Sequence, residues 1–176
     1  MPEPVTIRPA TREDLPALHP VIERAYRGES ARAGWTHEAD LIKQGARTDL
    51  ATLEAIVVDP SQRLLVACWG AGPIGCVHVN DIGGGRAYLG LLCVDPMLQA
   101  GGLGKQLVAA AEACARQLFG SQMMEMTVFE QRTELIAFYE RRGYRRAGEK
   151  RDYSILLDPP LFMDVLVKPL SPAASA

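Results

Sequence analysis

The stretch LLCVDPMLQAGGLGKQLVAAAEACA, which spans Leu91–Ala115, decides the fold of this chain. Its first residues are apolar and predict a buried strand, and the Asp95-Pro96 pair after them predicts a turn. A glycine-rich loop follows, and from Leu103 the apolar residues recur at helical spacing until Gly120. Small residues let backbone N–H groups approach a phosphate, and a helix N-terminus supplies further donors. The pattern predicts a phosphate site, although a tight turn without a ligand shares it.

The glycine loop fits one kind of phosphate loop better than two others. A Walker A loop needs a magnesium-binding Ser or Thr where this chain has Gln106, and a first glycine where it has Gln99. A dinucleotide-binding loop needs a third glycine where this chain has Leu107. The remaining pattern is Q-x-x-G-x-G, formed by Gln99, Gly102 and Gly104. It favours a pyrophosphate site that needs no metal.

The elements around the loop predict an α+β domain with a mixed sheet. Helices are expected from Thr11, over Thr36–Ala55 in broken form, from Leu103, and over Arg132–Arg142. Thr11 with Asp14 three residues later predicts a capping-box start for the first of them. Strands are expected at Val5–Ala10, Arg63–Gly70, Pro73–Asn80, Arg86–Asp95, Met123–Phe129, Asp152–Leu157 and Leu161–Leu170. We expect one domain over residues 1–170 and a flexible tail over 171–176.

Composition narrows the class of protein. The chain has 176 residues, of which 48% are hydrophobic and 23% charged, with a formal net charge of -2. This charge argues against a dedicated nucleic-acid binder. Cys68, Cys76, Cys93 and Cys114 form no C-x-x-C pair and lie in apolar stretches, so we expect buried free thiols and a reducing compartment. The N-terminus has no signal-peptide pattern, and a cytoplasmic protein is expected.

Three segments carry a family resemblance. Leu91–Ala115 resembles the acetyl-CoA-binding motif of the GNAT superfamily of N-acetyltransferases, in which a V-D-P strand end precedes Q/R-x-x-G-x-G/A. Leu135–Gly148, LIAFYERRGYRRAG, resembles the A-x-x-[FL]-Y-E-x-x-G-F segment, and Ile7–Leu18 resembles a common GNAT beginning. The match covers nearly the whole chain in order and spacing. It implies a central, mostly antiparallel twisted sheet of six to seven strands, flanked by about four helices.

The resemblance also implies a reaction. An acetyl group would pass from acetyl-CoA to a primary amine by direct attack in a ternary complex, with a small-molecule amine as the expected substrate. Two alternatives stay open: a protein N-terminus or lysine as acceptor, and a non-catalytic acyl-CoA-binding sensor domain. No metal, nucleic acid or membrane is expected as a partner, and a homodimer is left open.

In the family, backbone amides of the glycine loop bind the CoA pyrophosphate, and pantetheine pairs with the end of the preceding strand. The loop residues implied here are Gln99, Ala100, Gly101, Gly102, Leu103, Gly104 and Lys105. The strand residues implied are Leu92, Cys93 and Val94, where an amide would polarise the thioester carbonyl. Cys93 is expected to contribute its backbone and not its thiol. Arg132 stands where many members have asparagine and could reach a CoA phosphate or a bound product.

The resemblance assigns one catalytic residue clearly and a second less clearly. Tyr139 matches the family's general-acid tyrosine, although a core aromatic residue would show the same spacing. Some members carry a glutamate at the position of Thr127. Glu125 lies two residues earlier on the same strand face and is the expected general base, directly or through water. A structural carboxylate at Glu125, or His78 as the base, remain alternatives.

The family's usual position for the acceptor amine points to Arg27–Leu50. Trp35 and Glu38, with His37 and Asp40, could form a pocket in which an indole face and carboxylates attract an ammonium. Helix capping with a docking tryptophan would explain the same residues.

Overall fold

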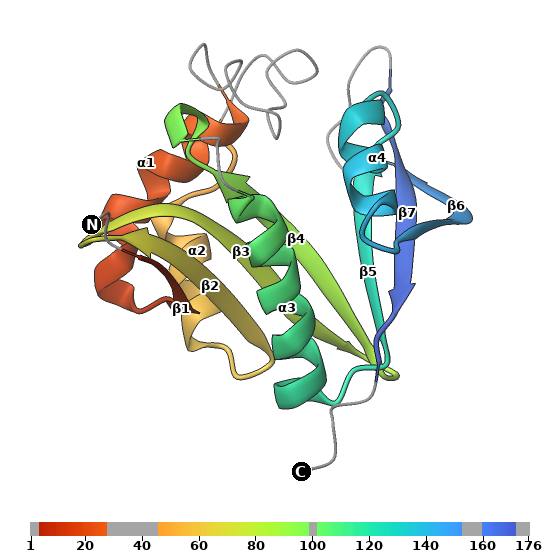
Figure 1. Cartoon of the computed structure of the whole chain (residues 1–176), viewed down its shortest axis with the longest axis horizontal. Coiled ribbons are helices and arrows are strands. Elements are labelled where there is room, and N and C mark those ends of the chain that lie inside the picture. Colours follow the sequence, from red (N-terminus) through yellow and green to blue (C-terminus); the bar gives the residue numbers. More distant parts are fainter. Residues whose placement is uncertain (1–3, 28–45, 99–101, 153–159, 172–176) are drawn as a thin grey trace.

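The computed structural model describes residues 4–27, 46–98, 102–152 and 160–171. Seven strands and four helices lie in this part of the chain (Figure 1). The helices are α1 (Leu15–Tyr26), α2 (Leu50–Val58), α3 (Leu103–Phe119) and α4 (Thr133–Glu140). The strands are β1 (Val5–Pro9), β2 (Gln62–Trp69), β3 (Gly72–Gly83), β4 (Arg86–Val94), β5 (Met123–Phe129), β6 (Arg145–Asp152) and β7 (Phe162–Pro169).

The strands form one sheet in the order β1-β2-β3-β4-β5-β7-β6. Neighbouring strands are antiparallel except β4 and β5, which are parallel. α3 connects this parallel pair, as a crossover helix must. The predicted α+β class, the mostly antiparallel sheet and the four flanking helices are therefore confirmed within the described residues.

Each face of the sheet packs against its own helices. On β2, Leu64, Val66 and Cys68 belong to the core that includes α1 and α2, whereas Leu65 and Ala67 belong to the core that includes α3 and α4. This alternation follows from the two-residue period of a strand. Figure 1 shows α3 in front of β2–β4, with α1 and α2 behind them. Burial of both faces accounts for the apolar strands around β4.

The sheet splits between β4 and β5. These strands pair only at Arg86–Tyr88 with Met123–Glu125, near the start of each strand. Beyond those pairs the strands diverge, so that the sheet opens like a V in Figure 1, with α3 beside one arm and α4 beside the other. The carboxyl-terminal halves of β4 and β5 therefore have backbone groups that the other strand does not pair with.

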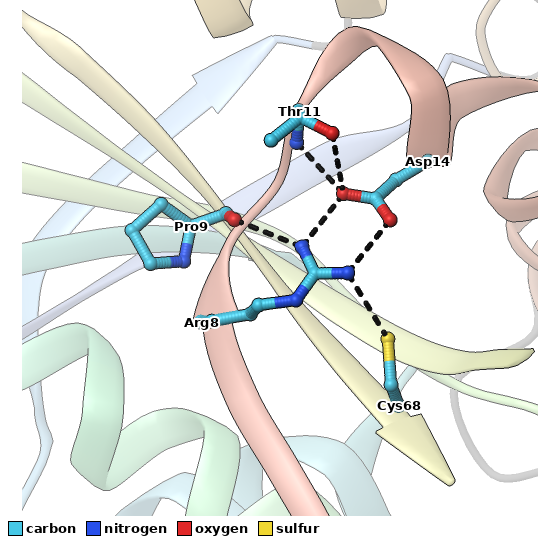
Figure 2. Close-up of polar contacts among 5 residues, drawn as sticks. All are labelled: Arg8, Pro9, Thr11, Asp14 and Cys68. Atoms are coloured by element: carbon cyan, nitrogen blue, oxygen red, sulfur yellow. Dashed lines mark hydrogen bonds and ion pairs between the residues drawn. The ribbon is translucent and has the colours of Figure 1, made fainter. Parts of the chain in front are cut away.

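A polar cluster fastens the N-terminal strand to the first helical turn (Figure 2). The Arg8 guanidinium donates to both carboxylate oxygens of Asp14, at 2.7 and 2.8 Å. Asp14 also accepts from the backbone N–H and hydroxyl of Thr11, which completes the predicted capping box. Arg8 further donates to the Pro9 carbonyl at 3.1 Å and to Cys68 Sγ at 3.9 Å.

One strand was not predicted, and two predicted elements are described only in part. The unpredicted strand is β6, Arg145–Asp152. β6 is an edge strand with almost every residue exposed. Its charged sequence has no alternation of apolar and polar residues, so the sequence pattern did not indicate a strand there. Of the strand expected over Asp152–Leu157, only Asp152 is described, at the end of β6, and residues 153–157 lie outside the described residues. Of the broken helix over Thr36–Ala55, the structure describes only the part after residue 45, where Asp49 caps α2 by accepting from the Thr52 N–H at 2.7 Å.

Other local predictions are confirmed. Gly120 ends α3 with a φ of +62°, in the left-handed region that favours glycine. All four cysteines are buried and free. Residues 172–176 of the predicted tail lie outside the described residues.

Candidate active site

A cavity of about 640 Å³ lies where β4 and β5 diverge. Its walls come from β4 (Tyr88–Leu92), β5 (Met126–Phe129), α1, α2 and α4. Tyr26 at the end of α1 and Tyr139 on α4 both line it. The split in the sheet therefore forms the floor of a pocket that collects residues from distant parts of the sequence.

A β-bulge shapes the β4 wall of this cavity. The register between β3 and β4 shifts between Cys76 and His78, and β4 has one residue more than β3 across the shift. Leu91, inside the bulge, has a φ of +50°, which strains a residue other than glycine. Leu89 packs with the α3–α4 core, whereas Leu91, two residues later, packs with the α1–α2 core, although residues two apart on a regular strand share a face. The bulge thus breaks the alternation of β4 at the cavity.

The predicted pantetheine residues lie at this bulge and after it. Leu92 lines the large cavity, and its carbonyl accepts a hydrogen bond from the Tyr26 hydroxyl. Cys93 turns its thiol into the α1–α2 core, where its Sγ lies 3.5 Å from that of Cys76. Val94 lines a second cavity. The burial of the Cys93 thiol agrees with a role for its backbone only.

The second cavity, of about 340 Å³, lies between the N-terminus of α3 and the side of α4. Gly102, Leu103, Gly104 and Lys105 line it from α3. Gly102 caps α3 with a φ of +72°, and the first intrahelical bond runs from Gln106 N–H to its carbonyl. The amides before Gln106 therefore have no intrahelical partner. Gln99, Ala100 and Gly101 lie outside the described residues.

Cationic side chains from the end of α4 also line the second cavity. Arg141, the C-cap of α4, and Arg142, the next residue, line it together with Lys105. Arg142 is held by a hydrogen bond of 2.7 Å to the Phe138 carbonyl, and its guanidinium stacks 3.8 Å from the centre of the Phe138 ring. A helix N-terminus together with three cations suits a polyanion such as a pyrophosphate.

Tyr139 is buried, with 4% of its surface exposed, and lines the large cavity. Its ring packs edge-on against Phe138 and Tyr144, with centroids 5.2 and 5.7 Å apart. Burial raises the pKa of its phenol well above the usual range, and the charge of Arg132 opposes this only partly. The phenol therefore keeps its proton near neutral pH, and the structure gives it no hydrogen-bond partner among the described residues.

The structure does not bring Glu125 to Tyr139. Its carboxylate lies 2.9 Å from Arg151 and 3.5 Å from Arg86, and Glu125 is not among the residues that line the cavity. Thr127 does line it, and its hydroxyl lies 2.5 Å from the hydroxyl of Tyr88. Glu125 thus has the position expected of a structural carboxylate beside two arginines.

His78 lines the large cavity from β3. Its Nε2 lies 2.6 Å from the side-chain oxygen of Gln62. Burial, and then the charge of Arg47, lower the pKa of its imidazole to about 4, so the ring is neutral at pH 7. The sequence pointed to His78 but not to Tyr26 or Tyr88, because aromatic residues beside an apolar stripe look like core residues. Arg47 lies within the range Arg27–Leu50 that was expected near the acceptor amine, but nothing in the sequence singled it out.

Of the remaining predicted site residues, one is described and two are not. Arg132 lies directly before α4 and lines the large cavity, near the other predicted site residues. Trp35 and Glu38 lie outside the described residues. Within the described ranges, no group of three His, Cys, Asp or Glu side chains is arranged to hold a metal, and no helix is long and apolar enough to cross a membrane.

Curated relatives resemble the chain over most of its length. It is 34% identical over 167 residues to the mycothiol acetyltransferase of Salinispora arenicola, covering 87% of this chain and 48% of that protein. It is 33% identical over 104 residues to the blasticidin-S acetyltransferase of Streptomyces morookaense, covering 59% of this chain and 72% of that protein. The chain thus spans about half the length of the mycothiol acetyltransferases it matches.

Solved structures share the fold. The ribosomal-protein-S18-alanine N-acetyltransferase of Escherichia coli superposes with a TM-score of 0.73 at 19% identity, over 98% of this chain and 97% of that chain. The PaiA N-acetyltransferase of Thermoplasma acidophilum, solved with coenzyme A, superposes with a TM-score of 0.70 at 20% identity, over 94% and 99%. At these identities the likeness concerns the fold.

The acetyltransferase (GNAT) family matches residues 22–144, which is more than half of the chain. The matched region contains β4, α3, β5 and α4, the elements that surround both cavities. The chain therefore belongs to the acetyltransferase (GNAT) family.

Proposed function

We propose that the chain is an N-acetyltransferase that moves an acetyl group from acetyl-CoA to a primary amine by direct attack in a ternary complex. The observation that carries this proposal is the meeting of two features at the split in the sheet. The amide-bearing N-terminus of α3 lines one cavity, which supports an anion site there, and Tyr139 on α4 lines the adjoining cavity. Leu135 lines both cavities, so they adjoin along α4.

The residues present fit acetyl-CoA. The backbone amides at Gly102–Lys105 would hold its pyrophosphate, with Gln99, Ala100 and Gly101 completing the loop. Leu92, Cys93 and Val94 would pair with its pantetheine arm, since β5 leaves that part of β4 unpaired. Arg132 would contribute charge at the cavity wall. Solved relatives of the same fold contain acetyl-CoA or coenzyme A, which supports this assignment.

Acetyl-CoA supplies an activated acyl group. The amine nitrogen forms the new bond to the carbonyl carbon, the carbon–sulfur bond breaks, and Tyr139 donates its proton to the leaving sulfur. A backbone amide near the β4 bulge would polarise the carbonyl. The raised pKa of Tyr139 keeps this proton available across the neutral range.

A proton must also leave the attacking nitrogen. His78 lines the cavity as a neutral imidazole, and we propose that it accepts this proton, directly or through water. Glu125 stays a prediction with less support, because two arginines hold its carboxylate away from the cavity lining. With a pKa near 4 the imidazole is a weak base, so the amine that binds should already be neutral.

We propose a small molecule as the amine. Two of the curated relatives carry the names mycothiol acetyltransferase and blasticidin-S acetyltransferase, and both names point to small molecules. Trp35 and Glu38 remain the proposed contacts to that amine.

The test has two steps on the purified chain. Calorimetry with acetyl-CoA should show saturable binding, and mass spectrometry should show acetylated product from a panel of small amines. Tyr139→Phe should leave acetyl-CoA binding intact and lower kcat about 100-fold, the usual contribution of a general acid. Tyr88→Phe is the matched control for loss of a cavity hydroxyl, because Tyr88 lines the same cavity and its hydroxyl contacts Thr127. Absence of acetyl-CoA binding would refute the proposal, and an unchanged kcat would remove Tyr139 from the mechanism.

A further inference from the structure

The two sides of the site lie on different arms of the split sheet. The anion site belongs to α3, which packs on β2, β3 and β4. Tyr139 belongs to α4, on the arm that contains β5, β6 and β7 (Figure 1). The strand ladder between β4 and β5 has only three residue pairs, and the Tyr88 and Thr127 hydroxyls add one contact beyond it. The spacing between the anion site and Tyr139 must therefore depend on further contacts between the arms.

A buried carboxylate on α3 provides such a contact. Glu112 is 7% exposed and accepts from the Lys168 ammonium on β7 at 2.7 and 3.2 Å. It also accepts from the hydroxyl of Tyr144, in the turn between α4 and β6, at 3.2 Å. One carboxylate on the first arm thus binds two donors on the second. We call Glu112, Lys168 and Tyr144 the Glu112 bridge.

The Glu112 bridge leads directly to Tyr139. The Tyr144 ring, 3% exposed, packs edge-on against the Tyr139 ring with centroids 5.7 Å apart. The Tyr144 N–H donates to the Tyr139 carbonyl at 3.2 Å. Lys168 lies 5.6 Å from the centre of the Tyr144 ring, and a Cβ at Gly143 would come within 3.2 Å of the Lys168 stem. The Tyr144 ring therefore contacts both Tyr139 and the lysine that binds Glu112.

Stability alone does not explain these polar residues. Removing a carboxylate and an ammonium from water costs free energy, and well-packed apolar side chains often stabilise a core as well as a buried ion pair does. A hydrogen-bonded pair differs from apolar packing because its geometry is directional. The bridge can therefore define how α3 and the α4–β6 turn lie relative to each other.

We propose that Glu112, acting through Lys168 and Tyr144, positions Tyr139 relative to the anion site at the N-terminus of α3. The inference rests on the proposed function, in which Tyr139 donates a proton to a group anchored at that N-terminus. Glu112 lies eight residues after Gly104, about 12 Å along the helix, so it does not itself contact the bound group. It is a positioning residue and not a catalytic one.

Three variants of the full chain test the proposal. Tyr144→Phe removes one hydroxyl and keeps the ring, Lys168→Met removes the charge, and the double variant E112Q/K168M replaces the ion pair without leaving either charge alone. The matched control is E130Q/K150M. It removes an exposed lysine–glutamate pair, 2.5 Å apart, that lies wholly within the β5–β7 arm. Thermal unfolding of every variant is measured, so that only folded variants enter the comparison.

The kinetic result should separate positioning from folding and binding. We expect kcat to fall about tenfold in Lys168→Met and in the double variant, because a small displacement of a reacting group is costly. Tyr144→Phe, which keeps the ring and the ion pair, should lower kcat by a smaller factor. The acetyl-CoA Kd and the control variant should be unchanged. In a Tyr139→Phe background the bridge variants should have no further effect, since a residue that acts through Tyr139 is not additive with it. Equal losses with and without the Tyr139 hydroxyl would overturn the proposal.

A second readout does not need an amine substrate. Carbon-13 labelling at tyrosine Cζ gives one NMR signal for each tyrosine, and Tyr139→Phe assigns the Tyr139 signal. We expect this signal to shift or broaden in Lys168→Met and in the double variant and to stay in place in the control. An unmoved signal would overturn the positioning role. If the unmodified chain acetylated no amine, the proposed function would fail while this readout still decided whether the bridge holds Tyr139.

Discussion

At the scale of single residues, burial sets the charge of the groups in the large cavity. Tyr139 and His78 lie at its walls, and burial favours the neutral form of both. A protonated phenol and an unprotonated imidazole are the forms that a donor and an acceptor of a proton need. The burial of His78 should lower the free energy of unfolding in acid, because the fold disfavours the protonated imidazole.

His78→Gln should make stability less sensitive to acid. The folded pKa of His78, about 4, lies below its ordinary value near 6.5, so the unfolded chain binds a proton first as the pH falls. The stabilisation from the neutral ring is complete above pH 6.5 and is lost between pH 6.5 and 4. Urea unfolding at several pH values should show a shallower decline for His78→Gln. Parallel curves for the two proteins would contradict the buried, neutral imidazole.

Asp14→Asn should weaken the fold at neutral pH. The hydrogen bonds from Arg8 lower the pKa of Asp14 to about 2, so its carboxylate stabilises the fold above its ordinary pKa and loses this effect as the pH falls toward 2. Because Arg8 is half exposed, we expect a loss of about 1 kcal/mol at pH 7. Glu54→Gln, in an exposed pair with Arg12, is the control and should change little. A loss as large at pH 2 as at pH 7 would argue against the ion pair.

At the scale of elements, the start of α3 depends on the backbone conformation of Gly102. A φ of +72° strains any residue with a Cβ, although the space around this position is open. Gly102→Ala should therefore misplace the first amides of α3 and raise the acetyl-CoA Kd about tenfold, equivalent to about 1.4 kcal/mol. Calorimetry measures this value directly.

Gly148→Ala is the matched control for that change. Gly148 has a φ of +82° with open space around it, but it lies on β6, away from the residues that line either cavity. Both variants should unfold at a similarly lowered temperature, and only Gly102→Ala should lose affinity. Equal affinities would show that the start of α3 does not bind the phosphates.

Helix ends and helices that a pattern of a few neighbouring residues determines could be predicted from the sequence. Elements that depend on pairing with a distant strand could not. The capping box at Thr11, the left-handed Gly120 and the apolar stripe of α3 all follow from short-range chemistry, and the structure confirms them. β6 has an exposed, charged sequence and owes its existence to pairing with β7. The bulge at Leu91 depends on the register between β3 and β4, which no single strand encodes.

At the scale of the whole molecule, the two cavities adjoin where one parallel pair interrupts an antiparallel sheet. The resemblance implied that the glycine loop, the end of the strand before it and Tyr139 form one site, and Tyr139 and Gly102–Lys105 do lie around these two cavities. The split itself could not be read from the sequence. The environment of Glu125 could not be predicted, because Arg86 and Arg151 reach it from β4 and β6. Contacts between distant strands decide which carboxylate faces a cavity and which faces an arginine.

The most direct test of an acetyltransferase site at this split is a crystal structure of the chain with acetyl-CoA bound. We predict that the pyrophosphate accepts hydrogen bonds from the amides at Gly102–Lys105 and that the pantetheine arm pairs with Leu92–Val94. The sulfur should then lie within hydrogen-bond reach of the Tyr139 hydroxyl. Binding of acetyl-CoA elsewhere on the molecule, or a sulfur turned away from Tyr139, would contradict the proposed site.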